Sequence, residues 1–577
     1  MGTISDKLMR IINTKEDIRQ ALISKGYDVP TSIPFKEYAK MILDLPCKVD
    51  SFPDIEGIVA RYSASGLTNE QMAANPVWVD KTGNGHDLQL KNFAWKGMSG
   101  VGGYVADIDE WGTNSTAAYF ERNSIKITAT FKENVSLGLL YHNIKLRQSC
   151  VLKVTGIPEG CDAFLDDRLG NRFYMSEDGV YEIIPSNFLA EALYFSIEKY
   201  PERWYGSKLT IEQLPLYPGA LVFDGVDDWA GCDNLPLLPK EKGYSIIALR
   251  NWITRYDATQ YKRPLISNLD TNDEGAFLIE YRKDENVNDV TGSYNSFTDV
   301  YIDDNNPITW QTSSSYNGQI IKKGTSKSTN KLCICKTYFG QLSNYANAAI
   351  WEIVILDHDA TEEELTKIKD YFIKTYPWLF PDQAWTVTGK TNEDEDRATI
   401  ANITGNGNDL VCLNLGFIEG RGYNEEGEYA GYLVTDGVDD KITSSTFEMG
   451  NDWTVIGDWE LINTGKKDNA GIVKFDSIVI YNYNPILINI KNGRNNLIPD
   501  QNTVNAICSD GRIYSKDWKE SIYNEETEST SKNLLTIGYS GNAYTKIAFK
   551  NLAIYPTVLS REDCIKAYNY LQTLKAK

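Results

Sequence analysis

The sequence predicts a mainly β protein with two copies of one β-sandwich, a smaller β-sandwich inserted into the first copy, and a short helical segment at the N-terminus. Three observations lead to this prediction. Short motifs recur in the same order, most apolar runs have the length and alternation of strands, and the first 47 residues have helical periodicity instead. With 577 residues the chain is too long for one hydrophobic core, so several domains are expected.

Three landmarks occur twice along the chain. They are TGNGHD from Thr82 and TGNGND from Thr404, LVFDGVDDW from Leu221 and LVTDGVDDK from Leu433, and a strand followed by an amphipathic helix at 351–372 and at 550–571. Because the landmarks recur in the same order, the chain contains two copies of one domain.

The spacing between landmarks differs in one place. Thr82 and Asp224 are 142 residues apart, whereas Thr404 and Asp436 are 32 residues apart. The first copy therefore carries about 110 additional residues there, which we place at 104–216. Four alternating segments predict a small β-sandwich in this insertion: 124–131, 150–156, 192–200 and 208–214. The predicted domains are 1–47, 48–380 interrupted by 104–216, and 381–577.

Each copy is expected to consist mostly of strands and to end in one helix. Runs such as YSIIALRNWI and SIVIYNY are short, β-type and bounded by turn residues. At the end of the first copy, Thr361 and Glu364 have the spacing of a capping box. Ser560 and Asp563 repeat it in the second copy. Leu365, Ile368 and Phe372 form the apolar stripe of the first helix.

Charge and composition exclude several classes of function. The net charge is −21, and no basic stretch could neutralise nucleic-acid phosphates or favour an anionic membrane surface. No apolar run reaches the ~18 residues of a membrane-spanning helix. The nine cysteines include no CxxC pair. Cys333 and Cys335 would share one face of a strand, where we favour buried thiols over a metal site.

The repeated DGVDD segment predicts a tight turn. Gly accepts a positive φ, and the preceding Asp224 or Asp436 can brace the turn through its carboxylate. We expect Val226 and its counterpart Val438 to point inward and the following Asp pair to face solvent. The alternative is that the carboxylates bind Ca²⁺. The structural interpretation is favoured because the sequence shows no full set of oxygen ligands, and no cofactor is predicted.

The sequence does not contain a recognisable catalytic motif. A retaining glycosidase needs two carboxylates that flank the scissile bond, yet no E-x-D-x-E or E-x-D-x-x-E strand is present. The acidic segment DIDEW at 107–111 lacks an alternating apolar frame. The motifs GxSxG, HExxH and GxGxxG are also absent. We therefore predict that the protein is not an enzyme.

Residues 1–47 contain two short amphipathic helical segments. Ile18 and Leu22 lie on one face of the first, and Phe35, Tyr38 and Ile42 lie along the second, which opens at a proline. Two such helices cannot bury their apolar faces alone. These five residues are the candidates for an anchor to another surface, and the alternative is that they cap the first sandwich.

The landmarks resemble those of the concanavalin A-like, laminin-G-type jelly-roll family. The resemblance rests on FDGVDD, on TGNGxD and on the final strand and helix, and it covers 50–103 with 217–380, and 381–577. It implies tandem jelly-roll domains. This family includes lectins, adhesion modules and some glycosidases, so the fold does not choose among them.

The segment TKEDIRQALISKGYDVPTSIPFKEYAKMI resembles the N-terminal segment of bacteriophage fibre and tail proteins. This resemblance implies a homotrimeric virion-surface fibre, made in the host bacterial cytoplasm and attached to capsid or another virion protein through 1–47. Glycans are the expected ligands, and neither nucleic acid nor a membrane is expected as a partner. A head fibre is favoured because no long shaft is present. The alternatives are a tail fibre or receptor-binding protein, a polysaccharide depolymerase, and a bacterial adhesin.

Exposed tryptophans could stack on sugar rings. The candidates are Trp95, Trp111, Trp204, Trp229 and Trp310. Core or sheet packing is the favoured interpretation for each of them, so none is named as a site.

Overall fold

The structure is a computed structural model, and it confirms the predicted mainly β, sandwich-like fold. The residues it describes are Lys15, 52–105, 118–123, 125–132, 138–144, 150–166, 172–183, 193–198, 200–238, 243–253, 262–270, 278–282, 308–312, 315–316, 319–320, 329–340, 344–425, 429–462, 471–475, 478–481, 486–490, 494–498, 504–515, 518, 520–522, 533–540, 543–574 and 576. The predicted helical anchor, with Ile18, Leu22, Phe35, Tyr38 and Ile42, lies outside these residues.

The chain divides into two compact units, 1–54 with 366–371, and 55–365 with 372–577. All the sheets described below belong to the second unit. Among the described residues, no helix is both long and apolar enough to span a lipid bilayer.

The first sandwich consists of an eight-stranded and a six-stranded antiparallel sheet. In the larger sheet the order is β21-β20-β19-β16-β23-β14-β4, and β1 also pairs with β23. In the smaller sheet it is β18-β17-β22-β15-β3-β2. The bounds are β1 Ile58–Ser63, β2 Val77–Trp78, β3 Leu88–Lys91, β4 Gly100–Val101, β14 Leu221–Asp224, β15 Trp229–Cys232, β16 Ser245–Trp252, β17 Lys262–Ser267, β18 Leu278–Arg282, β19 Ile308–Thr312, β20 Ser315–Tyr316, β21 Gln319–Ile320, β22 Leu332–Ile334 and β23 Asn347–Leu356.

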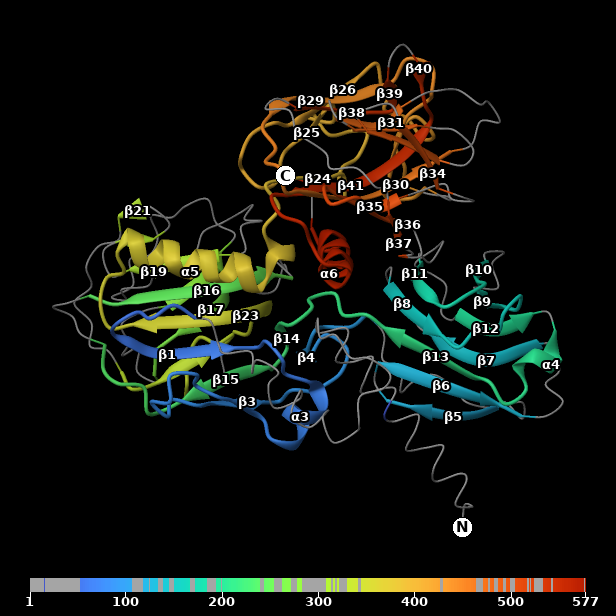
Figure 1. The fold of residues 1–577 in the computed structure, drawn as a ribbon. Helices are drawn as coiled ribbons and strands as arrows, with labels where there is room; N and C mark the ends of the chain where they lie inside the picture. Colours follow the sequence, from blue (N-terminus) through green and yellow to red (C-terminus); the bar gives the residue numbers. More distant parts are fainter. Residues whose placement is uncertain are drawn as a thin grey trace. The chain divides into compact units, whose positions relative to one another are not determined.

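The second sandwich consists of two eight-stranded sheets, drawn in orange to red in Figure 1. One has the order β27-β28-β41-β30-β35-β36-β37 with β24 on β41, and the other has the order β25-β26-β29-β38-β31-β32-β33-β34. The bounds are β24 Gln383–Thr386, β25 Thr399–Ile400, β26 Leu410–Leu413, β27 Gly422–Tyr423, β28 Leu433–Val434, β29 Lys441–Phe447, β30 Thr454–Leu461, β31 Gly471–Phe475, β32 Ile478–Tyr481, β33 Ile486–Ile490, β34 Arg494–Ile498, β35 Val504–Cys508, β36 Arg512–Ser515, β37 Glu520–Ile522, β38 Asn533–Ile537 and β41 Ile547–Tyr555. A separate two-stranded pair joins β39 Tyr539–Ser540 and β40 Ala543–Tyr544.

The two sandwiches share their central strand pairing. Strand β23 pairs with β1, β14 and β16, and β41 pairs with the corresponding β24, β28 and β30. Each central strand also contains a β-bulge. Trp351 of β23 has no partner residue on β16, and Lys550 of β41 has no partner residue on β30. A bulge bends and twists a strand locally, so its recurrence at the same place reflects one backbone design used twice.

The insertion forms its own pair of antiparallel sheets, drawn in cyan to green in Figure 1. The sheet orders are β10-β9-β12-β7 and β11-β8-β13-β6-β5. The bounds are β5 Ala118–Arg122, β6 Lys126–Phe131, β7 Gly138–Ile144, β8 Cys150–Thr155, β9 Asp162–Asp166, β10 Arg172–Met175, β11 Gly179–Ile183, β12 Leu193–Glu198 and β13 Lys208–Gln213. All four strands predicted here are present. Ile127, Ala129 and Phe131 of β6 are buried, as the alternating pattern predicts.

The helices are short and mostly capped by side chains. Their bounds are α3 Asn69–Ala74, α4 Pro201–Trp204, α5 Glu362–Thr375, the 3₁₀ turn η3 Pro377–Leu379 and α6 Arg561–Leu571. The predicted capping box is confirmed in α5, where the backbone N–H of Glu364 donates to Thr361 Oγ1 and the Glu364 carboxylate accepts from the backbone N–H of Thr361. Ser560 caps α6 through the backbone N–H of Asp563. These caps satisfy N–H groups that lack helical partners.

A histidine next to the α5 cap lies between two carboxylates. His358 Nδ1 lies 3.1 Å from Asp357 Oδ1, and Nε2 lies 3.1 Å from Glu364 Oε1. Burial lowers the pKa of His358, but hydrogen bonds to the carboxylates of Asp357 and Glu364 raise it, and the net pKa shift is upward from 6.5. A raised pKa in the folded state means that protonation of His358 favours folding.

The stabilisation from His358 should therefore be fully present below about pH 6.5 and be lost as pH rises through the higher pKa of the folded state. We expect scanning calorimetry to show that the unfolding temperature of the first sandwich falls as the pH rises above about 6.5. The His358→Asn variant should lack this slope. Equal slopes for the two proteins between pH 5.5 and 8 would contradict the assignment.

Candidate functional site: two acidic turns

The DGVDD segment of the first sandwich forms a turn between β14 and β15. Asp224 Oδ1 accepts backbone N–H bonds from Val226 at 2.8 Å, Asp227 at 3.3 Å and Asp228 at 3.4 Å. Gly225 has φ +77, and an added Cβ would lie 2.8 Å from the Asn347 Cβ. Glycine is required here by both conformation and space.

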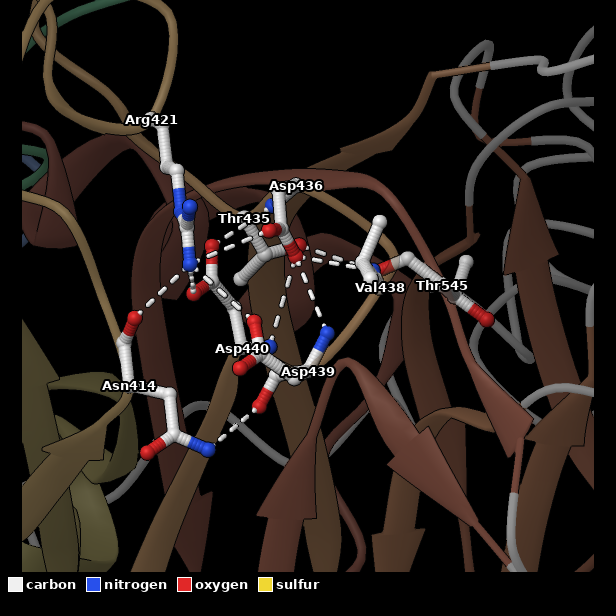
Figure 2. A network of polar contacts seen from close by, with 8 residues as sticks. All are labelled: Asn414, Arg421, Thr435, Asp436, Val438, Asp439, Asp440 and Thr545. Carbon is white, nitrogen blue, oxygen red and sulfur yellow. Dashed lines mark hydrogen bonds and ion pairs between the residues drawn. The ribbon is translucent and has the colours of Figure 1, made fainter.

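The second sandwich repeats this turn between β28 and β29, and Figure 2 shows the residues of the turn. Asp436 Oδ1 accepts from the N–H groups of Val438 at 2.7 Å, Asp439 at 3.2 Å and Asp440 at 3.3 Å. In both copies the first aspartate braces the turn, in agreement with the structural interpretation of the motif.

Two details of the sequence-based prediction are wrong. Val226 and Val438 do not point inward, because their exposed fractions are 72% and 71%. The Asp pair does not face solvent as a unit: Asp228 and Asp440 are both 0% exposed. The cause is the turn itself. Asp228 Oδ2 accepts the backbone N–H of Asp224 at 3.1 Å, which draws that carboxylate under the turn, and Asp440 does the same for Asp436 at 2.7 Å.

Each turn gathers three carboxylates. One carboxylate oxygen from each member lies within 4.8 Å of the others, both in the set Asp224, Asp227 and Asp228 and in the set Asp436, Asp439 and Asp440. Carboxylate oxygens are the preferred ligands of hard divalent cations. Like charges at this spacing repel one another unless a cation is close.

In the second sandwich a guanidinium group supplies that cation. Arg421 Nη2 lies 3.1 Å from Asp436 Oδ2, 3.0 Å from Asp439 Oδ1 and 3.1 Å from Asp440 Oδ1, as Figure 2 shows. Burial raises the pKa of Asp440 overall, although the hydrogen bond from Arg421 opposes that rise. The set of acids and Arg421 form one ion-paired network.

In the first sandwich Gly100 pairs with Val222 as Gly422 pairs with Val434 in the second, so Ser99, which carries no charge, corresponds to Arg421. Burial raises the pKa of the Asp228 carboxyl to about 7; the nearby Ser99 hydroxyl opposes this rise and the charge of Asp224 adds to it. Asp228 Oδ1 is shielded from solvent and has no hydrogen-bond partner among the described residues. The two acidic turns thus have the same backbone hydrogen bonds, but only the second has a cationic side chain at this position.

The TGNG landmark is structural in both copies. Asp80 Oδ1 accepts from the backbone N–H groups of Arg61 at 3.1 Å and Thr82 at 3.0 Å, and the Asn84 side chain donates to the Val59 carbonyl at 3.0 Å. In the second copy Asn402 Oδ1 accepts from the N–H groups of Ala384 and Thr404. The motif therefore ties the first strand of each sandwich to the following turn.

Of the five tryptophans, the structure describes the surroundings of three. Trp204 is 0% exposed and belongs to the core of the insertion. Trp95 is half-buried against the core of the first sandwich. The ammonium group of Lys336 lies 4.0 Å from the centre of the Trp229 ring. Trp111 lies outside the described residues, as does the side chain of Trp310. Packing is confirmed for Trp204 and for Trp95.

The cysteines are buried thiols wherever they are described. Eight are free and buried. The expectation that Cys333 and Cys335 share a face is wrong, because Cys335 has φ +57, which breaks the strand alternation after β22. Cys335 thereby joins Leu332 and Ile334 in the core between the sheets.

Sequence reasoning missed a concentration of exposed tyrosines in the insertion. Tyr119, Tyr174, Tyr200 and Tyr205 are 67%, 50%, 48% and 53% exposed. Among the residues whose side chains the structure describes, every aromatic one exposed by more than about a third belongs to this set. The four do not share a motif, so the only available signal was the frequency of tyrosine in the chain.

No protein-family model and no curated protein matches the chain. Three remotely similar solved structures are a Trypanosoma rangeli sialidase mutant displaying trans-sialidase activity, the T. rangeli sialidase in complex with sialic acid, and domain 4 of the Geobacillus stearothermophilus GH43 arabinanase AbnA in complex with arabinotriose. Their identities are 9%, 8% and 11%, and their TM-scores are 0.23, 0.25 and 0.20. The aligned parts cover 40%, 78% and 32% of this chain and 42%, 83% and 100% of those chains. At these TM-scores the similarity carries no argument about function.

Proposed function

We propose that the chain is a structural fibre protein on the surface of a bacteriophage particle, and that its inserted sandwich binds host-surface or mucosal glycans. The virion location rests on the resemblance of residues 1–47 to phage fibre segments and on the tandem sandwiches that follow. A homotrimer attached to the capsid through 1–47 remains the favoured arrangement, with a tail position as the alternative. The glycan-binding role rests on the exposed tyrosines.

The strongest support comes from the surroundings of α4, at one end of the insertion in Figure 1. Tyr200 and Tyr205 flank this helix, and the guanidinium carbon of Arg203 lies 4.5 Å from the centre of the Tyr200 ring. Tyr200 has φ +45, a conformation that is uncommon for a bulky residue. Tyrosine faces can stack on the C–H faces of a sugar, while the phenol and guanidinium groups can bond to its hydroxyls.

The glycan role is tested with the full chain on an array of bacterial and mucin glycans. Replacing both Tyr200 and Tyr205 with alanine should weaken binding about 5- to 150-fold, because each aromatic contact contributes about 0.5–1.5 kcal/mol. The control Val438→Ala removes a still more exposed apolar side chain from the second sandwich, where Val438 is 71% exposed, and should bind normally. Unchanged binding by the double variant would reject the role of these tyrosines.

The virion location has a separate test. Immunogold labelling of intact particles with an antibody against residues 381–577 should mark the capsid if the protein is a head fibre. Label at the tail would instead favour receptor binding by a tail fibre. Particles without label would reject the virion proposal, and turnover of capsular polysaccharide by the purified chain would then favour a depolymerase.

A further inference from the structure

We propose that the acidic turn of the first sandwich binds a divalent cation, best matched by Ca²⁺, through Asp224, Asp227 and Asp228. The cation would take the place that the Arg421 guanidinium occupies in the second sandwich. This inference concerns a separate part of the chain from the exposed tyrosines and does not depend on glycan binding.

The register of the sheets establishes which residues correspond. In the first sandwich Val222 pairs with Gly100, and in the second Val434 pairs with Gly422. Gly100 and Gly422 therefore occupy equivalent positions, and so do the residues that precede them, Ser99 and Arg421. Each of these two residues also forms an isolated β-bridge with the residue three positions earlier in the chain. Ser99 pairs with Lys96, and Arg421 pairs with Ile418. The same backbone thus presents a hydroxyl in one copy and a guanidinium group in the other.

The buried aspartate shows where a ligand would sit. In both copies the Oδ2 atom of this residue accepts the N–H of the first aspartate of the turn. The remaining atom, Asp440 Oδ1, accepts from Arg421 Nη2 at 3.1 Å. The corresponding Asp228 Oδ1 belongs to a side chain that is 0% exposed, and this oxygen has no hydrogen-bond partner among the described residues. It therefore faces the place that the guanidinium fills in the other copy.

The donor chemistry matches a hard cation. A buried carboxylate without a compensating partner is costly, and a cation shared by three carboxylates removes that cost. Ca²⁺ takes six to eight oxygens in flexible geometry, whereas Mg²⁺ requires a near-ideal octahedron. Three carboxylates and the Ser99 hydroxyl supply part of an irregular oxygen set, and water can complete it. Ca²⁺ is therefore the cation we choose.

The test exchanges the two residues that distinguish the copies. The full chain is freed of metal with a chelator and titrated with Ca²⁺ by calorimetry. Ser99→Arg should lower the stoichiometry by one ion per chain, because the guanidinium takes the place of the ion. Arg421→Ser should raise it by one, because it leaves the second set of carboxylates open. Asp228→Asn should lose the same site as Ser99→Arg.

Matched controls separate this site from general charge effects. Ser65→Arg adds the same charge at an exposed serine of the first sandwich, and Arg397→Ser removes the same charge from the second. Both should keep the parent stoichiometry. Circular dichroism checks folding, and if Ser99→Arg does not fold, Asp227→Asn at an exposed position replaces it and should weaken the site at least about tenfold. A folded Asp228→Asn or Ser99→Arg variant with the full stoichiometry would overturn the proposal.

Discussion

Replacing Arg61 with alanine is expected to lower the free energy of unfolding of the first sandwich by about 3–5 kcal/mol. Arg61 Nε donates to Glu352 Oε2 at 3.1 Å, and the Tyr376 hydroxyl donates to Glu352 Oε1 at 2.9 Å. The side chains of Arg61 and Glu352 are 5% and 0% exposed. Burial raises the pKa of Glu352 and Arg61 lowers it, so removal of the arginine leaves a desolvated acid without its counter-charge.

The second sandwich supplies the control for this variant. By strand register, Ala384 corresponds to Arg61 and Asn551 corresponds to Glu352. The double variant Arg61→Ala with Glu352→Asn therefore copies an arrangement that the chain already uses. It should recover much of the lost stability, because no charge is left buried. Scanning calorimetry with resolved transitions measures both effects. A double variant less stable than Arg61→Ala would contradict this account.

The parts of the fold that the sequence predicts well are those set by local pattern. The alternation in Lys126–Phe131 gives a half-buried strand, and the spacing of Thr361 and Glu364 gives a capping box. The repeated Asp–Gly pair gives a turn for the same reason. The alternation fails at Val226, because three successive N–H groups bond to one carboxylate there and the strand ends at Asp224.

The parts that the sequence does not predict depend on distant pairing. Arg61 and Glu352 are 291 residues apart. Glu352 lies in the strand of the third repeated landmark, but Arg61 lies in none of the landmarks. Arg421 likewise follows a loop whose sequence does not indicate contact with the acidic turn. The difference between the two turns can be recognised only when the strand register aligns Arg421 with Ser99. The exposure of Tyr119, Tyr174, Tyr200 and Tyr205 depends in the same way on how the insertion packs.

Replacing Trp204 with alanine should have the second large effect, a loss of about 3–5 kcal/mol confined to the inserted sandwich. Trp204 is 0% exposed, and its ring meets Phe131 edge to face with centroids 5.0 Å apart. Its indole N–H has no hydrogen-bond partner among the described residues, so the cost comes from lost packing and the cavity that remains. Tyr119→Ala, at a 67% exposed position of the same sandwich, should change stability by less than about 0.5 kcal/mol.

Limited proteolysis and calorimetry distinguish a local loss from a global one. In Trp204→Ala, cleavage should appear within 118–213 while the transition of the second sandwich stays unchanged, because the two cores are built from separate residues. Trp204→Phe should retain part of the packing and lie between the parent and the alanine variant. Because α4 ends at Trp204 and carries Arg203, glycan binding through Tyr200 and Tyr205 should fall together with the stability of the insertion. Stable Trp204→Ala protein with the parent's proteolytic resistance would show that this residue is not central to the core.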